Sequence, residues 1–581
     1  MIFVYSLAVF LNAALLFIVE PMVAKMILPY LGGSPAVWNT SLLFYQACLL
    51  AGYSYAHFGG AWLGTRRQLL LHLLLVFCAL SFLPVTLPMH WLTMSESNPV
   101  GLVLAVLTVS IGLPFLLLSA GAPLIQKWFA EGRPSHARDP YFLYAASNAG
   151  SLAGLLAYPL LLEINFTLSQ QNQLWLFGYL SLLGLLSLCG WHFLRASSGA
   201  DSVIPAAGAQ PDLLSNDAIA VTLSRRLRWV LWSFVPSSLL LGVTSYATTD
   251  VASAPLFWVV PLTAYLLSFI VAFARPSWAV NSVLVRFQAL LLLGSISTIF
   301  VSATQPVRYI LPLHLVGFFV TSLICHGQLS KDRPEARSLT DFYLWISVGG
   351  VLGGVFNALI APVIFTGVSE YPLAIAAAAF LRPCLGDPQD SHLSRRLDWF
   401  LPLALVGAIV AIAVVLKNAA ILTTGNDGVF ICGVSAAALL AFVHRPRRFG
   451  VGVSALIFLS LWYPSAAGEL LYADRSFFGS YRAMLQVAGN RHVLFQGTTV
   501  HGAQNRAPEM LQQPLTYFHR SGPAGQVLRS FAKSHREGRV GIVGLGTGAL
   551  ACHGSAGQSY TFYEIDPMVE RIARDDKLFS A

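Results

Sequence analysis

Apolar stretches of membrane-spanning length recur along the chain from its N-terminus to residue 466. A helix of about 20 apolar residues crosses the hydrocarbon core of a bilayer. Because hydrocarbon offers no partners to backbone N–H and C=O groups, such stretches fold as helices that satisfy these groups internally. The sequence therefore predicts a multi-pass α-helical membrane bundle.

The composition is that of an integral membrane protein. Charged residues make up 10% of the 581-residue chain, against about 25% in soluble proteins. We attribute the net charge of +9 to basic cytoplasmic loops. No Lys/Arg-rich run with interleaved aromatic residues occurs, so no nucleic-acid partner is expected. The seven cysteines form no C-x-x-C pair, so neither a metal site nor a disulfide framework is expected.

Fifteen spans are predicted, and two of them, 369–383 and 449–466, are short for a crossing. A Ser/Ala/Gly/Asp-rich linker at 196–226 separates a first repeat, 1–195, from a second repeat with extra helices, 227–466. The other spans lie near residues 2–30, 36–57, 68–88, 99–122, 141–164, 173–194, 228–247, 254–274, 285–303, 308–326, 341–366, 398–416 and 428–444.

The two halves share aromatic, proline and glycine positions. These matches predict two parallel repeats, an arrangement that resembles the two halves of major facilitator transporters. At an offset of 220, Pro35, Trp38, Leu42 and Tyr45 match Pro255, Trp258, Leu262 and Tyr265. At an offset of 200, Phe142, Ser147, Gly150, Leu152 and Gly154 match Phe342, Ser347, Gly350, Leu352 and Gly354.

Few polar groups interrupt the spans, and intramembrane ionisable groups are functional candidates by default. Glu20 either holds a cationic substrate, lies near the interface, or pairs with Lys25. The amides are expected to form interhelical hydrogen bonds. The full set is Glu20, Lys25, Asn39, Gln46, Asn148, His326 and Asn357.

Basic residues gather in alternate loops, which by the positive-inside rule places these loops and the N-terminus in the cytoplasm. The loops at 89–98, 165–172 and 247–253 carry no Lys or Arg. The basic set is Arg66, Arg67, Lys127, Arg133, Arg138, Arg225, Arg226, Lys331, Arg333, Arg337, Arg395, Arg396, Arg445, Arg447 and Arg448.

Beyond residue 466 the chain becomes polar. Residues 467–522 read as a small β domain, with strands at 480–487 and 491–496 joined by a hairpin turn and a third strand at 498–504. A helix is expected at 525–535. Residues 523–581 read as the start of an α/β Rossmann-like domain.

The segment 539–567 has the pattern of a nucleoside-binding turn. A short buried parallel strand, 540–543, leads into Gly544-Leu-Gly546-Thr547-Gly548, and a second strand, 560–565, carries an acid 20 residues after Gly544. Such an acid, here Glu564, can bind ribose hydroxyls. Gly544, Gly546 and Ala549 satisfy the dinucleotide pattern, and Gly544-x-Gly546-x-Gly548 favours S-adenosylmethionine; a turn without ligand is the remaining alternative.

Several segments resemble the spermidine synthase (polyamine aminopropyltransferase) family, in its membrane-fused bacterial branch. They are Arg475-Ser-Phe-Phe-Gly479, Gly497-Thr-Thr-Val-His-Gly-Ala-Gln504, Pro514-Leu-Thr-Tyr-Phe-His-Arg-Ser-Gly-Pro523, Val543-Gly-Leu-Gly-Thr-Gly548 and Tyr563-Glu-Ile-Asp566. The runs 20–29 and 32–40 are similar to the membrane part of the same fused proteins.

The resemblance implies transfer of an aminopropyl group from decarboxylated S-adenosylmethionine to a polyamine such as putrescine. It implies that the turn glycines face the donor, that Glu564 holds the ribose, and that Tyr517 and His519 lie near donor and amine. The expected cofactor-contacting residues are Gly544, Gly546, Thr547, Gly548, Glu564 and Asp566. Gln504 or His501 would take the place of the family's glutamine near the substrate.

Two features depart from the family. Thr547 replaces the Asp usual in the glycine turn, which leaves methyl transfer or ligand sensing open. The family's catalytic Asp would lie beyond Ala581, so the chain is expected to be truncated and inactive as given.

The main functional hypothesis is thus a spermidine synthase-like transferase in the bacterial inner membrane, in contact with the lipid bilayer and a small cation. The alternatives are a polyamine or cation transporter or sensor with a regulatory nucleoside-binding domain, a methyltransferase, and a nicotinamide-dependent oxidoreductase. Fifteen spans after a cytoplasmic N-terminus would place the soluble part outside. Because the expected donor is a cytoplasmic metabolite, we expect a cytoplasmic soluble part and one re-entrant segment.

Overall fold

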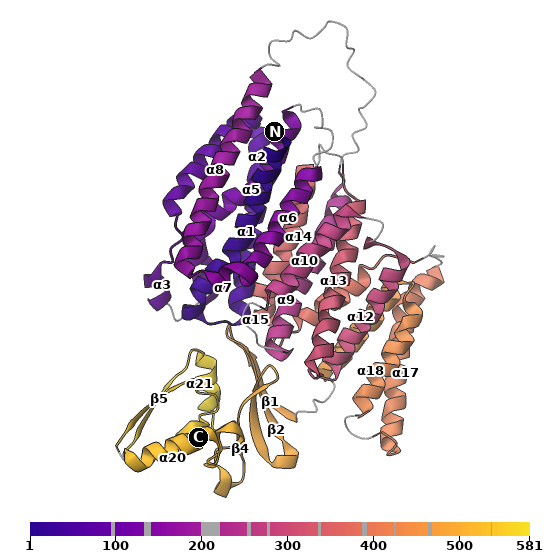
Figure 1. Cartoon of the computed structure of the whole chain (residues 1–581). Helices are drawn as coiled ribbons and strands as arrows, with labels where there is room; N and C mark the ends of the chain where they lie inside the picture. Colours follow the sequence, from indigo (N-terminus) through magenta and orange to yellow (C-terminus); the bar gives the residue numbers. More distant parts are fainter. Residues whose placement is uncertain are drawn as a thin grey trace.

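A computed structural model describes two connected parts, a helical bundle and a smaller C-terminal module (Figure 1). The module, residues 468–580, lies at one end of the bundle, and the N-terminus lies near the other end (Figure 1). The described residues are 1–94, 99–132, 141–198, 221–251, 257–275, 279–334, 339–385, 392–422, 426–462, 468–535 and 537–580.

The first half of the bundle contains five long helical rods and several short connecting helices. Its second rod, α2, is broken at Gly64 (φ 72°, ψ 159°), which separates the spans predicted at 36–57 and 68–88. The elements are α1 (Ile2–Leu31), α2 (Pro35–Cys78), η1 (Ala79–Phe82), α3 (Met89–Met94), α4 (Pro99–Leu107), η2 (Thr108–Gly112), α5 (Leu113–Glu131), α6 (Tyr141–Ala157), η3 (Tyr158–Leu162), α7 (Glu163–Asn165) and α8 (Leu168–Ser198).

The second half begins at Leu223 and continues to Trp462. Most of the predicted linker, 199–220, lies outside the described residues. The elements are α9 (Leu223–Tyr246), η4 (Ala247–Val251), α10 (Val259–Ala274), α12 (Ser282–Phe300), α13 (Val307–Lys331), α14 (Leu339–Val355), η6 (Phe356–Ile360), α15 (Ala361–Ile364), α16 (Glu370–Phe380), α17 (His392–Asn418), α18 (Asn426–Leu439), η7 (Leu440–Phe442) and α19 (Pro446–Trp462).

The predicted membrane bundle is confirmed in its class. Ten helical segments among the described residues are long and apolar enough to cross a bilayer, and further short apolar helices accompany them. The chain is therefore an integral membrane protein. The segment expected at 369–383 forms α16, which has only 11 residues and is shorter than a full crossing of about 20.

Glycines set the closest helix packing in both halves. A Cβ on Gly150 of α6 would lie 2.2 Å from the carbonyl oxygen of Phe10 in α1. In the second half, a Cβ on Gly349 of α14 would lie 2.4 Å from the carbonyl oxygen of Val230 in α9. The same packing therefore recurs at an offset of 199, and the predicted pairing of Gly150 with Gly350 was wrong by one residue. Gly350 itself has no neighbour within 4 Å of an added Cβ.

Gly154 follows the same rule. It faces the backbone of Ala14 in α1, and Gly353 faces Ser237 in α9. The predicted partner Gly354 instead faces Gln46 of the other half. The pattern indicates equivalent α1–α6 and α9–α14 pairs, held together by close backbone approach rather than by large side chains.

The halves meet through α2 against α14 and through α6 against α10. Polar side chains cross this interface: the amide of Asn39 donates to Ser245 (2.9 Å), and that of Gln46 donates to Ser237 (3.0 Å). Asn357 donates to Ser238 within the second half (2.8 Å). The expected interhelical role of these three amides is confirmed.

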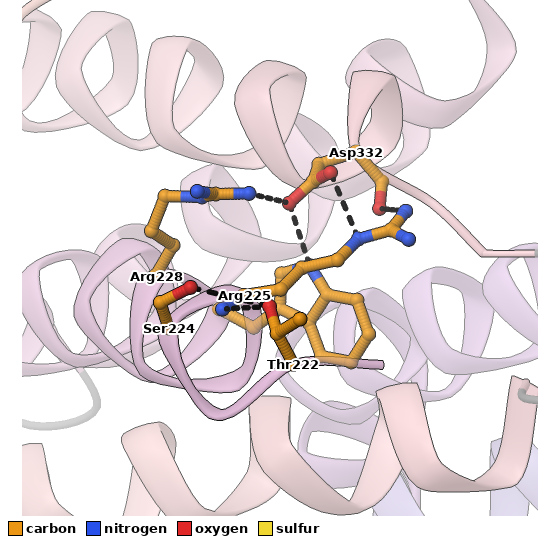
Figure 2. A network of polar contacts seen from close by, with 6 residues as sticks. Thr222, Ser224, Arg225, Arg228 and Asp332 are labelled. Carbon is orange, nitrogen blue, oxygen red and sulfur yellow. Dashed lines mark hydrogen bonds and ion pairs between the residues drawn. The ribbon is translucent and has the colours of Figure 1, made fainter. Parts of the chain in front are cut away.

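A polar network ties α9 to α13 (Figure 2). It lies at the end of the bundle far from the module, because the other end of α9 leads through η4 to Asp250, which contacts Thr498 of the module. Asp332 accepts from Arg225 Nε (3.0 Å), from Trp229 Nε1 (3.0 Å) and from Arg228 (3.5 Å). Thr222 caps the first turn of α9. One carboxylate with three donors is the paired arrangement that a partly buried charge requires, and it links the start of α9 to the end of α13.

The module combines an antiparallel sheet, in the order β1-β2-β3-β4, with a parallel pair, β5–β6. The predicted hairpin is confirmed by β2 and β3, and the third predicted strand by β4, whereas β1 was not predicted. The elements are β1 (Glu469–Arg475), β2 (Ser480–Gln486), η8 (Val487–Gly489), β3 (Arg491–Gln496), β4 (Thr499–Asn505), η9 (Pro508–Met510), η10 (Thr516–Phe518), α20 (Pro523–Ser534), β5 (Arg539–Val543), η11 (Ala549–His553), β6 (Ser559–Tyr563) and α21 (Pro567–Ala573).

The strand predicted at 540–543 and its parallel pairing are confirmed by β5 and β6, but the prediction that this strand is buried was wrong. Val543 is 93% exposed and Tyr563 of β6 is 64% exposed, because the described residues place no further strand or covering helix on this pair. A two-stranded pair does not establish a Rossmann-like domain. The module core lies instead where α21 packs on the antiparallel sheet, through Met568, Val569 and Ile572 against Tyr481 and Leu494.

Substitution of Gly150 by Ala tests the glycine packing. The added methyl must displace the α1 backbone, so we expect destabilisation of about 1–3 kcal/mol, the usual range for overpacking. Thermal unfolding of the detergent-solubilised protein measures this as a lower Tm. Gly350→Ala is the matched control and should leave Tm unchanged or slightly higher, since Ala favours helix over Gly. Equal Tm values for the two variants would show that Gly150 is no more closely packed than Gly350, which would contradict the assignment of Gly349 as the equivalent of Gly150.

Candidate functional site

A cavity of about 240 Å³ lies between the two halves, midway along the bundle. Both halves contribute to its wall, through α1, α2, α5 and α6 on one side and α9, α10 and α14 on the other. We call it the central cavity. Its polar lining residues are Asn12, Glu20, Tyr45, Gln46, Tyr53, Ser119, Tyr144, Ser147, Asn148, Ser151, Tyr265, Tyr343 and Ser347.

Residues that the sequence comparison matched between the two halves line the central cavity from both sides. Tyr45 and Tyr265, which are 220 apart in sequence, both line it. Ser147 and Ser347, which the sequence matched at an offset of 200, one position away from the glycine packing offset of 199, also both line it. The sequence matches therefore converge on one site, although nothing in the sequence pattern required them to share a cavity.

Glu20 is the acidic residue of the central cavity lining. It is 5% exposed, and its Oε2 atom has no hydrogen-bond partner among the described residues. The alternative that Glu20 pairs with Lys25 is wrong, because Lys25 forms an ion pair with Glu163 of α7. The interface alternative is also disfavoured, since Glu20 lies about three turns before the end of α1 and is buried.

Other polar atoms on the cavity-lining residues are also unpartnered within the described structure. They are the amide oxygens of Asn12 and Gln46 and the hydroxyl of Tyr45. Carboxylate and amide oxygens are acceptors only. A buried group of this kind costs free energy unless a donor reaches it. Three unpartnered acceptors therefore lack donors, the Tyr45 hydroxyl is the one member of this set that can donate, and no Lys or Arg among the described residues lines the central cavity.

Aromatic side chains bound the central cavity at both ends. Toward the module, Trp38 of α2 and Trp258 stack face to face with ring centroids 3.5 Å apart and planes 16° from parallel. Toward the opposite end, Tyr144 stacks on Tyr343 at 6.2 Å, and Tyr53 lies 6.2 Å from the same ring. Trp38 and Trp258 are one of the residue pairs matched in sequence at an offset of 220. Pro255, which was matched to Pro35 at the same offset, lies outside the described residues.

A second space of about 260 Å³, which we call the vestibule, lies on the module side of the Trp38–Trp258 stack. Trp38 and Trp258 line the vestibule, and one helical turn inward Leu42 and Leu262 line the central cavity. The stack therefore forms the partition between the two spaces. The remaining vestibule wall is Ala24, Lys25, Leu28, Gly32, Gly33, Ser34, Pro35, Val37, Ser41, Thr244 and Thr248.

A separate space of about 360 Å³ lies beside the glycine turn of the module. Gly544, Gly546 and Glu564 line it, together with His501 and the bundle turn Gly32–Ser34. Gly544, Gly546 and Gly548 adopt φ values of 90°, 58° and 75°, which favour glycine. Burial lowers the pKa of His501 from its ordinary value, while the nearby Glu564 carboxylate opposes that shift.

Glu564 acts within the turn itself. Its Oε2 accepts from the Leu545 N–H (2.8 Å) and its Oε1 from the Asp566 N–H (3.0 Å). Asp566 is 2% exposed and caps α21 by accepting from Met568 N–H (2.9 Å). These contacts give both carboxylates a structural role that the sequence pattern alone did not reveal.

The other predicted site residues do not line the space beside the glycine turn. Thr547 is buried against Gly502 of β4 and does not line the module space. Gln504 holds the backbone of Ser580 by accepting its N–H at 2.9 Å. Tyr517 is 56% exposed, and His519 bonds to the neighbouring Ser521 (2.7 Å). The structure thus brings together Gly544, Gly546, Glu564 and His501 only.

Comparison with known proteins finds similarity to solved structures only. No family model and no curated protein matches the chain. Among solved structures, the inward-open xylose transporter XylE from E. coli matches with 14% sequence identity and a TM-score of 0.42, covering 68% of this chain and 98% of XylE. None of these comparisons supports the resemblance to the spermidine synthase family.

Substitution of Glu564 by Ala tests the structural role of this carboxylate. Two hydrogen bonds to a charged acceptor are lost, each worth about 1.5–3 kcal/mol. We expect backbone amide exchange at Leu545 and Asp566 to become at least about tenfold faster, as measured by hydrogen–deuterium exchange. Glu570→Ala, which removes an exposed pair with Arg574, is the control. Unchanged exchange at both amides would show that Glu564 does not hold the turn.

Proposed function

We propose that the helical bundle transports a small organic cation, of the polyamine class, through the central cavity. The observation that carries this proposal is the unpartnered, buried Glu20 carboxylate in a space lined by equivalent residues of both halves. Sites at the interface of repeats, near the middle of the membrane, are typical of secondary transporters.

The chemistry of the lining favours a cation with N–H donors. An ammonium group would supply both the positive charge and the donors that Glu20, Asn12 and Gln46 lack. Aromatic faces such as those of Tyr45 and Tyr265 attract cations. A sugar or a carboxylic acid would leave the Glu20 charge uncompensated, which makes a neutral or anionic cargo less favourable.

The two aromatic layers support movement rather than static binding. The Trp38–Trp258 stack and the tyrosine layer each join residues of both halves. Rocking of one half against the other would open one layer while the other stays closed, which is the motion expected of repeat-built transporters.

Glu20→Gln tests the proposal. The substitution keeps size and hydrogen bonding but removes the charge, so we expect uptake of radiolabelled putrescine into proteoliposomes to fall at least about tenfold, equivalent to about 1.4 kcal/mol. Glu131→Gln is the matched control, because Glu131 lies at the end of α5 and outside the cavity lining. Equal uptake by Glu20→Gln and the unaltered protein would refute a role for this carboxylate.

A second proposal concerns the module, where the left-handed glycine turn beside a space of about 360 Å³ supports binding of a nucleoside ligand such as S-adenosylmethionine. Gly544 is open to the space, with no neighbour within 4 Å of an added Cβ. The residues fit a regulatory ligand better than aminopropyl or methyl transfer, because Tyr517 and His519 lie away from the space. Calorimetry on the full chain with S-adenosylmethionine, its decarboxylated form and NAD would distinguish the ligands.

We also propose that the module lies on the non-cytoplasmic face of a bacterial inner membrane, opposite to the side expected from the cytoplasmic donor. α9 begins at the basic cluster of Arg225 and continues through η4 to Asp250, which contacts Thr498 of the module. The basic residues of the Gly64 turn likewise lie at the end away from Ser34. Arg133, Arg138 and Arg337 lie outside the described residues. The positive-inside rule supports a cytoplasmic location for the basic end.

Cysteine labelling tests this orientation. Arg520 lies on the exposed surface of the module, so an Arg520→Cys variant should react with a membrane-impermeant maleimide added to spheroplasts. Mass spectrometry of the modified peptide separates this site from the native cysteines. Labelling only after the membrane is opened would place the module in the cytoplasm.

A further inference from the structure

The module contacts both halves of the bundle at the same face. On the first half, the Ser34 hydroxyl donates to the carbonyl oxygen of Phe477 (3.4 Å), and the Phe477 side chain packs against the hydrophobic core of that half. On the second half, the Thr498 hydroxyl donates to the carbonyl oxygen of Asp250 (2.7 Å). The module is therefore attached to both of the bodies that a rocking motion would separate.

The most deeply buried polar attachment described here is an ion pair between Arg475 and Glu370 of α16. The two guanidinium nitrogens donate to the two carboxylate oxygens at 3.1 and 3.0 Å, and Arg475 also donates to the carbonyl oxygen of Gly367 at 2.8 Å. Glu370 is fully buried and the Arg475 side chain is 11% exposed. Such a pair gives geometric specificity more than net stability, because desolvation offsets its attraction.

The segment Arg475–Gly479, which we call the wedge, enters the seam between the halves. It shares one small space with Pro35 and Asn39 of α2 and with Ser245 and Asn357 of the second half. Ser476 of the wedge contacts Asp566, the cap of α21. The wedge is thus fixed to the folded module through α21.

The wedge lies next to the Trp38–Trp258 stack. Trp38 is one turn after Pro35 on α2, so the helix start that touches the wedge also carries one ring of the stack. The other ring, Trp258, belongs to the second half, whose α16 and η4 are held by Arg475 and Thr498. Separation of the two rings requires the halves to part at the face where the module bridges them.

We propose that the C-terminal module is a clamp that keeps the Trp38–Trp258 stack closed from the module face, and that release of the wedge opens the central cavity to that face. The identity of the transported molecule rests on the transport function proposed above. The clamp controls only whether the central cavity can be reached from the module face, so it can be tested without a transported molecule.

The test uses Ser347→Cys as a reporter in the full chain, because Ser347 lines the central cavity and is 6% exposed. A small cationic methanethiosulfonate reagent is added from the face that labels Arg520→Cys. Mass spectrometry of the peptide that contains residue 347 gives the rate apart from the seven native cysteines. With the wedge intact, we expect slow labelling.

Two independent variants release the wedge. Arg475→Gln combined with Glu370→Gln removes the ion pair without leaving one charge buried alone, and Phe477→Ala removes the contact with the first half. Each should raise the rate at residue 347 at least about tenfold in protein that remains monodisperse by gel filtration. Arg491→Gln, on the exposed part of β3 and away from the bundle, is the control and should not change the rate.

Removal of the stack itself, by Trp38→Ala with Trp258→Ala, should raise the rate even when the wedge is intact. If this variant stays slow, the stack is not the partition and the proposal is overturned. If it becomes fast but both wedge variants stay slow, the module is not a clamp and the proposal is equally overturned. Loss of putrescine uptake in Glu20→Gln is independent of these rates, so failure of the clamp and failure of the transport function are distinguishable.

Discussion

A carboxylate without a partner inside an apolar bundle is the interaction on which the interpretation of this protein depends. Glu20 lies in a cavity whose other unpartnered atoms are mainly acceptors, from Asn12 and Gln46. In a medium of low dielectric constant an ionisable group without a partner is costly, which is the reason for proposing that Glu20 binds a ligand. The surrounding architecture, two halves joined by α2–α14 and α6–α10, places that carboxylate at the centre of the membrane part.

The connection between bundle and module follows from a second buried charge. Glu370 would be costly in the bundle without Arg475, and Arg475 comes from the strand that begins the module. The bundle supplies the carboxylate and the module supplies the guanidinium of one buried ion pair at the face where they meet. The Gly32–Ser34 turn strengthens this link, because it lines both the vestibule and the space beside the glycine turn.

Local sequence patterns predicted the elements well and their environments poorly. The apolar runs gave the helices, and the turn at 488–490 gave the β2–β3 hairpin, because each depends on neighbours in sequence. The strand at 540–543 was predicted as buried, yet burial depends on what covers it, and Val543 is exposed. Likewise the sequence pattern of Glu564 and Asp566 predicted ligand contacts, and it carried no sign that both side chains also accept hydrogen bonds from backbone N–H groups.

The sequence by itself determined that this chain is a helical membrane protein with a polar C-terminal part, because hydrophobic length and the need to satisfy backbone groups leave few alternatives. It also indicated equivalent positions in the two halves, such as Trp38 and Trp258. Only the tertiary structure decided that these residues stack, that Tyr45 and Tyr265 share a cavity with Glu20, and that Lys25 pairs with Glu163. Such contacts join residues more than 100 positions apart. The hydrophobic periodicity of a helix shows which of its faces is apolar but does not show which other helix packs against that face.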